Sequence, residues 1–230
     1  MKAEYHEITR RLREERENCG WTQVDICRKV YMSQGHYCKA EMGKNRFTHS
    51  ELQYLVKAGI DLHYVYTGEK IINSECYEFF SHCDRKEMQC LAEMALPLIA
   101  YCAKELPEEK AEEVQERAKY IKCILMQDSQ EDSCFFLLRR YKGYSQRYMA
   151  SLLGVDIKKY CSLENSRSFG DSEILLQMYN CFHLSPLILL NDESGLAREI
   201  CGLLGQLEDE TGHILFEYLK SGYNKLIAKK

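Results

Sequence analysis

Residues Gly20–Arg46, which read GWTQVDICRKVYMSQGHYCKAEMGKNR, carry the strongest structural signal in this sequence. Thr22 is a good N-cap for a helix that begins at Gln23, and Ser33 is a good N-cap for a second helix soon after it. The few residues between these two helices leave no room for a strand. The stretch therefore predicts two short helices that are joined by a tight turn and followed by a basic loop.

The same pattern occurs a second time in the chain. A shift of 123 residues places GYSQRYMASLLGVDIKKYCSLENSRSF, residues 143–169, over the first stretch without a gap. A duplicated fold unit explains this agreement better than chance does. The identical aligned pairs are Gly20 with Gly143, Gln23 with Gln146, Tyr37 with Tyr160, Cys38 with Cys161 and Glu41 with Glu164.

The composition predicts an all-α protein. Only three prolines and thirteen glycines interrupt the 230 residues, and long segments place apolar residues three and four positions apart. We expect two helical bundles joined by a helical hairpin, with a pair of helices at the C-terminal end. The predicted parts are residues 1–72 (the first repeat), an acidic spacer at 73–132, residues 133–193 (the second repeat) and the C-terminal helices at 194–230. The candidate core residues of the first repeat are Val30, Tyr37, Leu52 and Leu55.

Charge is distributed unevenly along the chain, although the net charge is only −4. Residues 1–50 carry ten Lys or Arg against seven Asp or Glu, and residues 134–170 carry seven against two. Residues 74–133, between them, carry seven against fourteen. Two basic blocks flank an acidic spacer, a pattern compatible with binding of a polyanion by the blocks.

Twelve cysteines suggest disulfides or a zinc site, but their spacing argues against both. No C-x-x-C pair occurs, and Cys76, Cys83 and Cys90 are seven residues apart, as on one helix face. We interpret the cysteines as reduced, small core residues of a protein in a reducing compartment. We predict neither a metal site nor a cofactor.

With these residues laid out, the first repeat resembles the phage-repressor and Cro type of helix-turn-helix, called the XRE family. The features that carry the resemblance are Thr-Gln and Ser-Gln at two helix starts, the close Glu41–Arg46, and DLHYVYTGE further on. The resemblance covers residues 6–69, and more weakly residues 134–193, where Ser166 replaces Gly43. It implies two lambda-repressor-like helix-turn-helix bundles and a transcriptional regulator that binds double-stranded DNA.

The family resemblance also implies which residues face DNA. Its third helix lies in the major groove, while its second helix and the flanking loops grip the backbone. Gln34 can pair with adenine, and Lys39 can reach guanine or a phosphate; a solvated basic face is the plain alternative for the cations. The base-reading candidates are Gln34, Gly35, Cys38 and Lys39. The phosphate-binding candidates are Arg13, Gln23, Lys44, Asn45 and Arg46.

The second repeat departs from the family pattern where the third helix begins. Asp156 and Ile157 stand there in place of Ser33 and Gln34. An isoleucine can contact a thymine methyl group, whereas an aspartate is repelled by phosphate. Two interpretations stay open: a second DNA reader, or a former reader that now packs or binds a partner. Its DNA-contact candidates are Arg147, Ile157, Lys158, Lys159 and Arg167.

The spacer and the C-terminal segment carry broad apolar helix faces that must be buried. Either the repeats of the same chain or a second subunit could cover them, so a homodimer is one expectation. Pro97 should kink the first spacer helix unless the helix ends there. A charged start and short apolar runs, such as ALPLIAYCA, predict a cytoplasmic protein without a membrane span.

The leading hypothesis is a sequence-specific, DNA-binding transcriptional regulator. The alternative is a protein-interaction or antitoxin-like adaptor, in which the second repeat and the remaining helices bind a protein or peptide. We expect no enzyme, because no paired carboxylates, Ser-His-Asp set or phosphate-binding loop is present.

Overall fold

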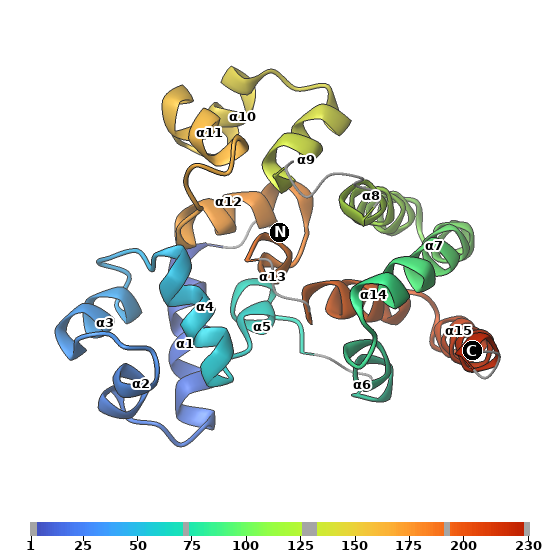
Figure 1. Ribbon diagram of the computed structural model, residues 1–230, viewed down its shortest axis with the longest axis horizontal. Coiled ribbons are helices and arrows are strands. Elements are labelled where there is room, and N and C mark those ends of the chain that lie inside the picture. Colours follow the sequence, from blue (N-terminus) through green and yellow to red (C-terminus); the bar gives the residue numbers. More distant parts are fainter. Residues whose placement is uncertain (1–3, 71–73, 126–132, 191–193, 228–230) are drawn as a thin grey trace. The chain divides into compact units, whose positions relative to one another are not determined.

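The structure is a computed structural model that describes residues 4–70, 74–125, 133–190 and 194–227. All regular secondary structure in these residues is helical (Figure 1), so the all-α prediction is confirmed. None of the helices within these ranges is both long and apolar enough to cross a membrane. The chain divides into two compact units, and each combines two separate segments. Unit 1 contains Met1–Lys70 and Glu131–Asp192, and unit 2 contains Ile71–Gln130 and Glu193–Lys230.

The first repeat folds into five helices, and side-chain caps set the starts of the last four. Thr22 and Asp25 form a reciprocal capping box, in which the Thr22 amide donates to the Asp25 carboxylate over 3.0 Å. The Ser33 hydroxyl accepts from the His36 amide, so both predicted N-caps are confirmed. All four candidate core residues are buried. The helices are α1 (Tyr5–Asn18), α2 (Gln23–Lys29), α3 (Gln34–Glu41), α4 (His49–Ala58) and α5 (Leu62–Thr67).

The second repeat builds the same order of helices with different caps. Ser145 caps the second helix, and the Asp156 carboxylate caps the third by accepting from the Lys159 amide over 2.9 Å. Pro186 occupies the first turn of the last helix, where its missing N–H costs nothing. The helices are α9 (Cys134–Lys142), α10 (Gln146–Leu152), α11 (Ile157–Glu164), α12 (Ser172–Phe182) and α13 (Pro186–Leu189).

The two repeats meet inside unit 1 around one buried serine. Ser172, at the start of α12, exchanges hydrogen bonds with Phe47: its amide donates to the Phe47 carbonyl over 2.9 Å, and its hydroxyl accepts from the Phe47 amide. The Tyr5 hydroxyl lies 2.7 Å from the same serine oxygen, and the Tyr66 hydroxyl donates to the Ser172 carbonyl. Burial raises the pKa of Tyr66, so this hydroxyl keeps its proton. Ser172 thus joins three groups of the first repeat to the second.

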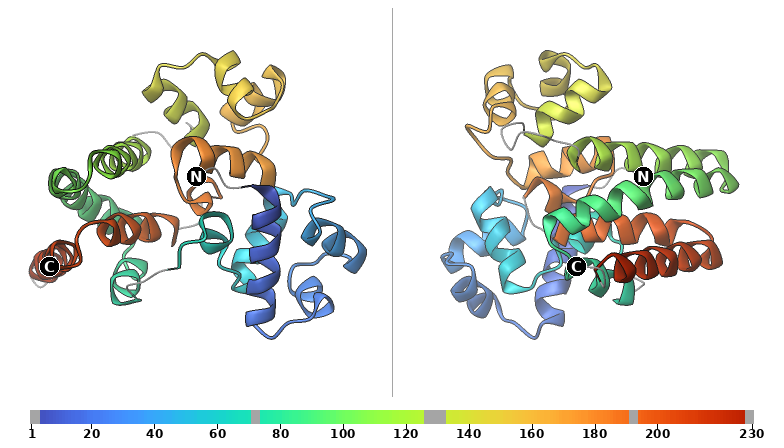
Figure 2. Two further views of the ribbon diagram at one scale, coloured as in Figure 1. Left: turned by 180° about the vertical axis from the view of Figure 1, so that it is seen from behind. Right: turned by 45° about the vertical axis from the view of Figure 1, so that its right-hand side comes forward.

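Helix packing and two further polar contacts extend this junction. α5 packs against α12 and α13. The buried His63 ring lies 3.1 Å from the Ser185 hydroxyl, and the Gln53 side-chain amide donates to the Leu190 carbonyl over 3.1 Å. Figures 1 and 2 show α4, α5, α12 and α13 in the middle of unit 1, with α2–α3 and α10–α11 at its two ends.

Unit 2 is built from the acidic spacer and the C-terminal segment together. α7 packs along α8, and α14 contacts α6, α7, α8 and α15. The buried Arg117 of α8 pairs with the buried Glu199 of α14 over 3.2 Å. α7 continues through Pro97 and ends at Cys102, so the proline does not end the helix. The helices are α6 (Ser74–Ser81), α7 (Arg85–Cys102), a short 3-10 helix (Ala103–Glu105), α8 (Glu108–Leu125), α14 (Ser194–Gln206) and α15 (Asp209–Ile227).

Left-handed backbone marks equivalent turns in the two repeats, but the residues there differ. After the third helix, Gly43 has φ +75° and its counterpart Ser166 has φ +55°. Between the second and third helices, Tyr31 has φ +56° and its counterpart Gly154 has φ +64°. Glycine adopts this conformation without a steric penalty, whereas it destabilises other residues. At each of these two turns, therefore, one repeat has glycine and the other a strained residue, Tyr31 or Ser166.

Replacing Ser166 with glycine should stabilise unit 1 by about 0.5–1 kcal/mol, because the steric cost of left-handed backbone exceeds the extra chain entropy of glycine. The measurement is the urea concentration at the midpoint of unfolding. The matched control is Gly43→Ala: its new Cβ would meet atoms no closer than 3.7 Å, so only the backbone conformation should cost stability. A lower midpoint for Ser166→Gly than for the parent chain would contradict the assigned strain.

Candidate nucleic-acid interface

The outer face of α3 presents the residues that the sequence marked for base reading. Gln34, Gly35 and Lys39 are exposed and Cys38 is half-buried, while Tyr37 and Ala40 between them are fully buried. The helix is thus anchored by one face and open along the other. Its exposed face offers an amide at the first turn and an ammonium group one turn later, with little side-chain bulk between them.

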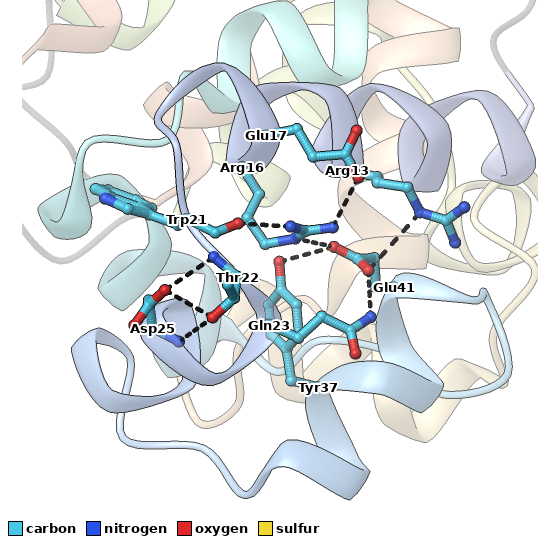
Figure 3. A network of polar contacts seen from close by, with 9 residues as sticks. All are labelled: Arg13, Arg16, Glu17, Trp21, Thr22, Gln23, Asp25, Tyr37 and Glu41. Atoms are coloured by element: carbon cyan, nitrogen blue, oxygen red, sulfur yellow. Dashed lines mark hydrogen bonds and ion pairs between the residues drawn. The ribbon is translucent and has the colours of Figure 1, made fainter.

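A buried carboxylate at the end of α3 holds the helices of the first repeat together (Figure 3). The Glu41 side chain is fully buried and accepts from Arg16 Nε of α1 over 2.7 Å and from Gln23 Nε2 of α2 over 2.7 Å. The Tyr37 hydroxyl donates to it over 3.3 Å. Burial, followed by the nearby Glu41 charge, raises the pKa of Tyr37, so the hydroxyl stays a donor. One side chain therefore ties α1, α2 and α3 to each other.

The Arg16 guanidinium is satisfied on its other side as well. It donates to the Trp21 carbonyl over 2.6 Å and to Glu17 over 3.1 Å (Figure 3). The carbonyl belongs to the segment that leads into α2, so Arg16 also fixes where α2 begins. A buried ion pair needs such additional hydrogen bonds to offset the loss of hydration.

The second repeat contains the same network 123 residues later. Arg139 Nε donates to Glu164 over 2.9 Å, Gln146 Nε2 donates to it over 2.8 Å, and Arg139 also donates to the Tyr144 carbonyl over 3.0 Å. Tyr160 differs from its counterpart, because its hydroxyl donates to the Phe135 carbonyl. The glutamine and glutamate pairs that align in the sequence are thus partners within each repeat.

The phosphate candidates of the first repeat lie in different environments. Arg13 and Lys44 are exposed, although Arg13 Nε approaches Glu41 to 3.8 Å. Asn45 is half-buried, with its amide 3.5 Å from His36 Nδ1. Arg46 pairs with Glu173 of the second repeat and lies over the Tyr5 ring, 4.1 Å from its centroid. Arg46 therefore also belongs to the junction between the repeats.

Gln23, a phosphate candidate of the sequence, makes a contact within the repeat that the sequence did not indicate. Its side-chain amide nitrogen already donates to Glu41, so a phosphate would meet only its remaining amide proton. Its backbone N–H at the start of α2 keeps the favourable position of a helix N-terminus for an anion. The phosphate role of Gln23 stays a prediction, and its packing role is the new observation.

The second repeat presents four of its five candidates openly. Arg147, Ile157, Lys158 and Arg167 are exposed, and Lys159 is half-buried. Two aromatic side chains lie nearby in the chain: Tyr148 is 49% exposed, and Phe169 is 58% exposed and stacks on the His49 ring of the first repeat at 4.5 Å. The second repeat therefore exposes both cationic and apolar side chains, and Phe169 among them also contacts the first repeat.

Arg16, Arg139 and Ser172 are the residues that sequence reasoning missed. A signal for the two arginines exists, because they are also related by the 123-residue shift and lie just before the repeated stretch. Ser172 aligns with His49, so the repeat holds no signal for it. Ser172 makes its contacts at the junction between the repeats, and because this junction occurs once, it leaves no repeated pattern.

Comparisons with protein-family models, with curated proteins and with solved structures found no match to this chain. Within the described residues, no group of three or more His, Cys, Asp or Glu side chains is placed to hold a metal ion. What the chain binds has to be inferred from the side chains that unit 1 presents.

Glu41→Gln should lower the free energy of unfolding of unit 1 by about 3–5 kcal/mol, because the buried charge of Arg16 would keep only the exposed Glu17 as its counter-charge. Urea unfolding measures the effect. Glu17→Gln is the matched control: its carboxylate also bonds Arg16 but is 58% exposed, so its loss should cost about 0.5 kcal/mol. Equal unfolding midpoints for the two variants would show that the buried carboxylate does not hold the repeat together.

Proposed function

We propose that this chain is a sequence-specific, DNA-binding transcriptional regulator of the XRE helix-turn-helix type. In this proposal α2 and α3 form the helix-turn-helix, α3 enters the major groove, and α10 and α11 are its counterparts in the second repeat. One observation carries the proposal. Each repeat holds a short helix by the same buried Arg–Glu–Gln network and leaves the outer face of that helix open to solvent.

The exposed face of α3 suits base reading. The major groove admits an α-helix, and a glutamine side chain can donate to and accept from adenine at once. Gln34 lies in the first turn of α3, where recognition helices of this type contact bases. Gly35 and the half-buried Cys38 keep the face low, so the backbone of α3 can come close to the base edges.

The surroundings of α3 suit the phosphate backbone. Lys44 follows α3 in an exposed loop, and Arg13 is exposed on α1. Such contacts fix the register of a protein on DNA without reading its sequence. The network around Glu41 supports phosphate binding by α1 and α2, because it holds these two helices against α3, the proposed recognition helix.

The second repeat has the chemistry for DNA contact as well. Exposed Arg147, Lys158 and Arg167 supply positive charge, and Ile157 can contact a thymine methyl group. The Asp156 carboxylate, which the sequence suggested would repel phosphate, accepts the Lys159 backbone N–H. The backbone N–H groups at the start of α11 therefore partly offset the negative charge of Asp156.

Both readers belong to unit 1, and the contacts around Ser172 favour a fixed geometry between them. Helix-turn-helix dimers bind half-sites about one helical turn apart, roughly 34–36 Å. Two repeats that share a buried junction can supply such a pair from one chain. We therefore propose that a single chain binds two half-sites at one preferred spacing.

A second candidate function is a protein-interaction adaptor, and the exposed apolar side chains of the second repeat favour it. Tyr148, Ile157 and Phe169 are 49%, 44% and 58% exposed. Aromatic residues are enriched at protein interfaces. The salt dependence of DNA binding separates the candidates: it is steep where several phosphates are contacted, and nucleic acid binding is absent or weak in the adaptor.

Gln34→Ala should reduce discrimination at one base pair of the DNA site by about 1–3 kcal/mol and leave affinity for unrelated DNA unchanged, because it removes a hydrogen-bonding partner of a base and no partner of a phosphate. The site is first selected from a random duplex library and its single-base variants are then titrated. Gln89→Ala in α7, outside unit 1, is the control. If the parent chain binds the site and all its variants equally, α3 is not the reader.

Lys158→Ala combined with Lys159→Ala should lower affinity for all sequences and flatten the plot of log K against log salt, by about 0.9 for each phosphate that the protein ceases to neutralise. Fluorescence anisotropy over a range of salt concentrations measures the slope. The control replaces Lys119 and Lys122, two exposed lysines of α8, with alanine. An unchanged slope in the first variant would assign DNA binding to the first repeat alone.

A further inference from the structure

Two cysteines of unit 2 lie in direct contact, although they are 125 positions apart in the sequence. The sulfur atoms of Cys76 in α6 and Cys201 in α14 are 2.8 Å apart, with one thiol donating to the other. Cys76 is 1% exposed and Cys201 is 8% exposed. The sequence pattern placed Cys76 on one helix face with Cys83 and Cys90, which is wrong because Cys76 lies in α6 and Cys90 in α7. It did not single out Cys201.

The other cysteines show that burial is not the rule for this residue in the chain. All twelve lie in described residues and are thiols, but only Cys27, Cys76 and Cys201 are buried. Cys19 and Cys90 are exposed, and the other seven are half-buried. A general use of cysteine as a small core residue therefore does not explain the contact between Cys76 and Cys201.

The helices that carry Cys76 and Cys201 are the first helices of the two chain segments that make up unit 2. α6 is the first helix after the crossing at residue 71, and α14 is the first helix after the crossing at residue 193. The two helices pack against each other, and Phe80, one turn after Cys76, is buried between neighbours that include Phe216. The thiols thus face each other from two helices that are already held together.

We propose that Cys76 and Cys201 form an intramolecular disulfide when the protein meets a thiol oxidant, and that this bond clamps the two entry helices of unit 2. A disulfide needs about 2.05 Å between its sulfur atoms, so the thiols would approach by roughly 0.8 Å. Two S–H bonds break and one S–S bond forms. The two protons and two electrons pass to the oxidant; a small disulfide such as oxidised glutathione takes them up and becomes two thiols.

The clamp has a clear effect on the unfolded chain. A bond between residues 76 and 201 closes a loop that contains α7, α8 and the whole second repeat. Cross-linking distant residues removes conformational freedom from the unfolded state, and more so for longer loops. The oxidised protein should therefore unfold at a higher temperature than the reduced protein.

Burial makes the exchange slow at neutral pH. The hydrogen bond with Cys76, followed by burial, raises the pKa of the Cys201 thiol far above its ordinary value. The thiolate is the attacking species in disulfide exchange, so little of it is available while α6 and α14 stay packed. The same burial slows reduction of the bond once it has formed, so dithiothreitol has to act for a correspondingly long time.

The experiment incubates the full chain with oxidised glutathione, blocks the remaining thiols with iodoacetamide under denaturing conditions, and identifies linked peptides by mass spectrometry. We expect a peptide pair joined through Cys76 and Cys201. We also expect a rise in the unfolding temperature, which dithiothreitol reverses. Recovery of both cysteines in the alkylated form after prolonged incubation would overturn the proposal.

Three variants make the result specific. Cys76→Ser and, independently, Cys201→Ala should each abolish the rise in unfolding temperature, whereas Cys90→Ser, at an exposed cysteine of α7, should retain it. Each variant is compared with its own reduced form, so a variant of lower stability still gives a readout, and either member of the pair suffices if the other does not fold. A rise of the same size in both Cys76→Ser and Cys201→Ala would assign the stabilisation to another pair and contradict the clamp.

Discussion

A carboxylate without access to water is the constraint on which each repeat depends. Glu41 and Glu164 end the third helices, and each is buried against an arginine from the first helix and a glutamine from the second. A buried charge is tolerated only where its partners are in place. The three helices of a repeat cannot shift separately without exposing or orphaning that charge. The outer faces of α3 and α11 are therefore presented by rigid supports.

The junction around Ser172 is the second constraint, and it occurs once. Hydrogen bonds of this one buried serine join backbone and side-chain groups of the first repeat to the second. Arg46 adds an ion pair with Glu173, and Phe169 adds a ring contact with His49. A duplicated unit thus acquired contacts that its two copies do not share. This asymmetry matches the divergence of their outer faces, where Gln34 stands opposite Ile157 in the alignment.

Much of the fold could be predicted from the sequence, because its determinants are local. The caps at Thr22, Ser33, Ser145 and Asp156 act within four residues, and apolar periodicity identified Tyr37 as a core residue. Other features depend on distant partners. Gln23 looks like a solvent-facing helix start until its contact with Glu41 is known, and Arg16 looks like one more charge on α1. Helix periodicity shows that the spacer and C-terminal faces must be buried, but not that they bury each other in unit 2.

The candidate site was predictable to a similar degree. The exposure of Gln34, Gly35 and Lys39 follows from the period of a single helix, whereas Cys38, which the same period places on that face, is half-buried. Arg46 was beyond such reasoning, since its position depends on Glu173, which lies 127 residues away in the sequence. For the residues at the junction, neither the internal repeat nor the local sequence pattern indicates their contacts.

The proposed function requires that one chain presents two DNA-reading helices at a fixed spacing. Footprinting of a fragment enriched from sheared genomic DNA tests this requirement, with the chain-to-DNA ratio of the complex measured by native mass spectrometry. We expect two protected half-sites, about one helical turn apart, at one chain per fragment. Absence of enrichment at low salt, or a single protected half-site per chain, would contradict the proposal.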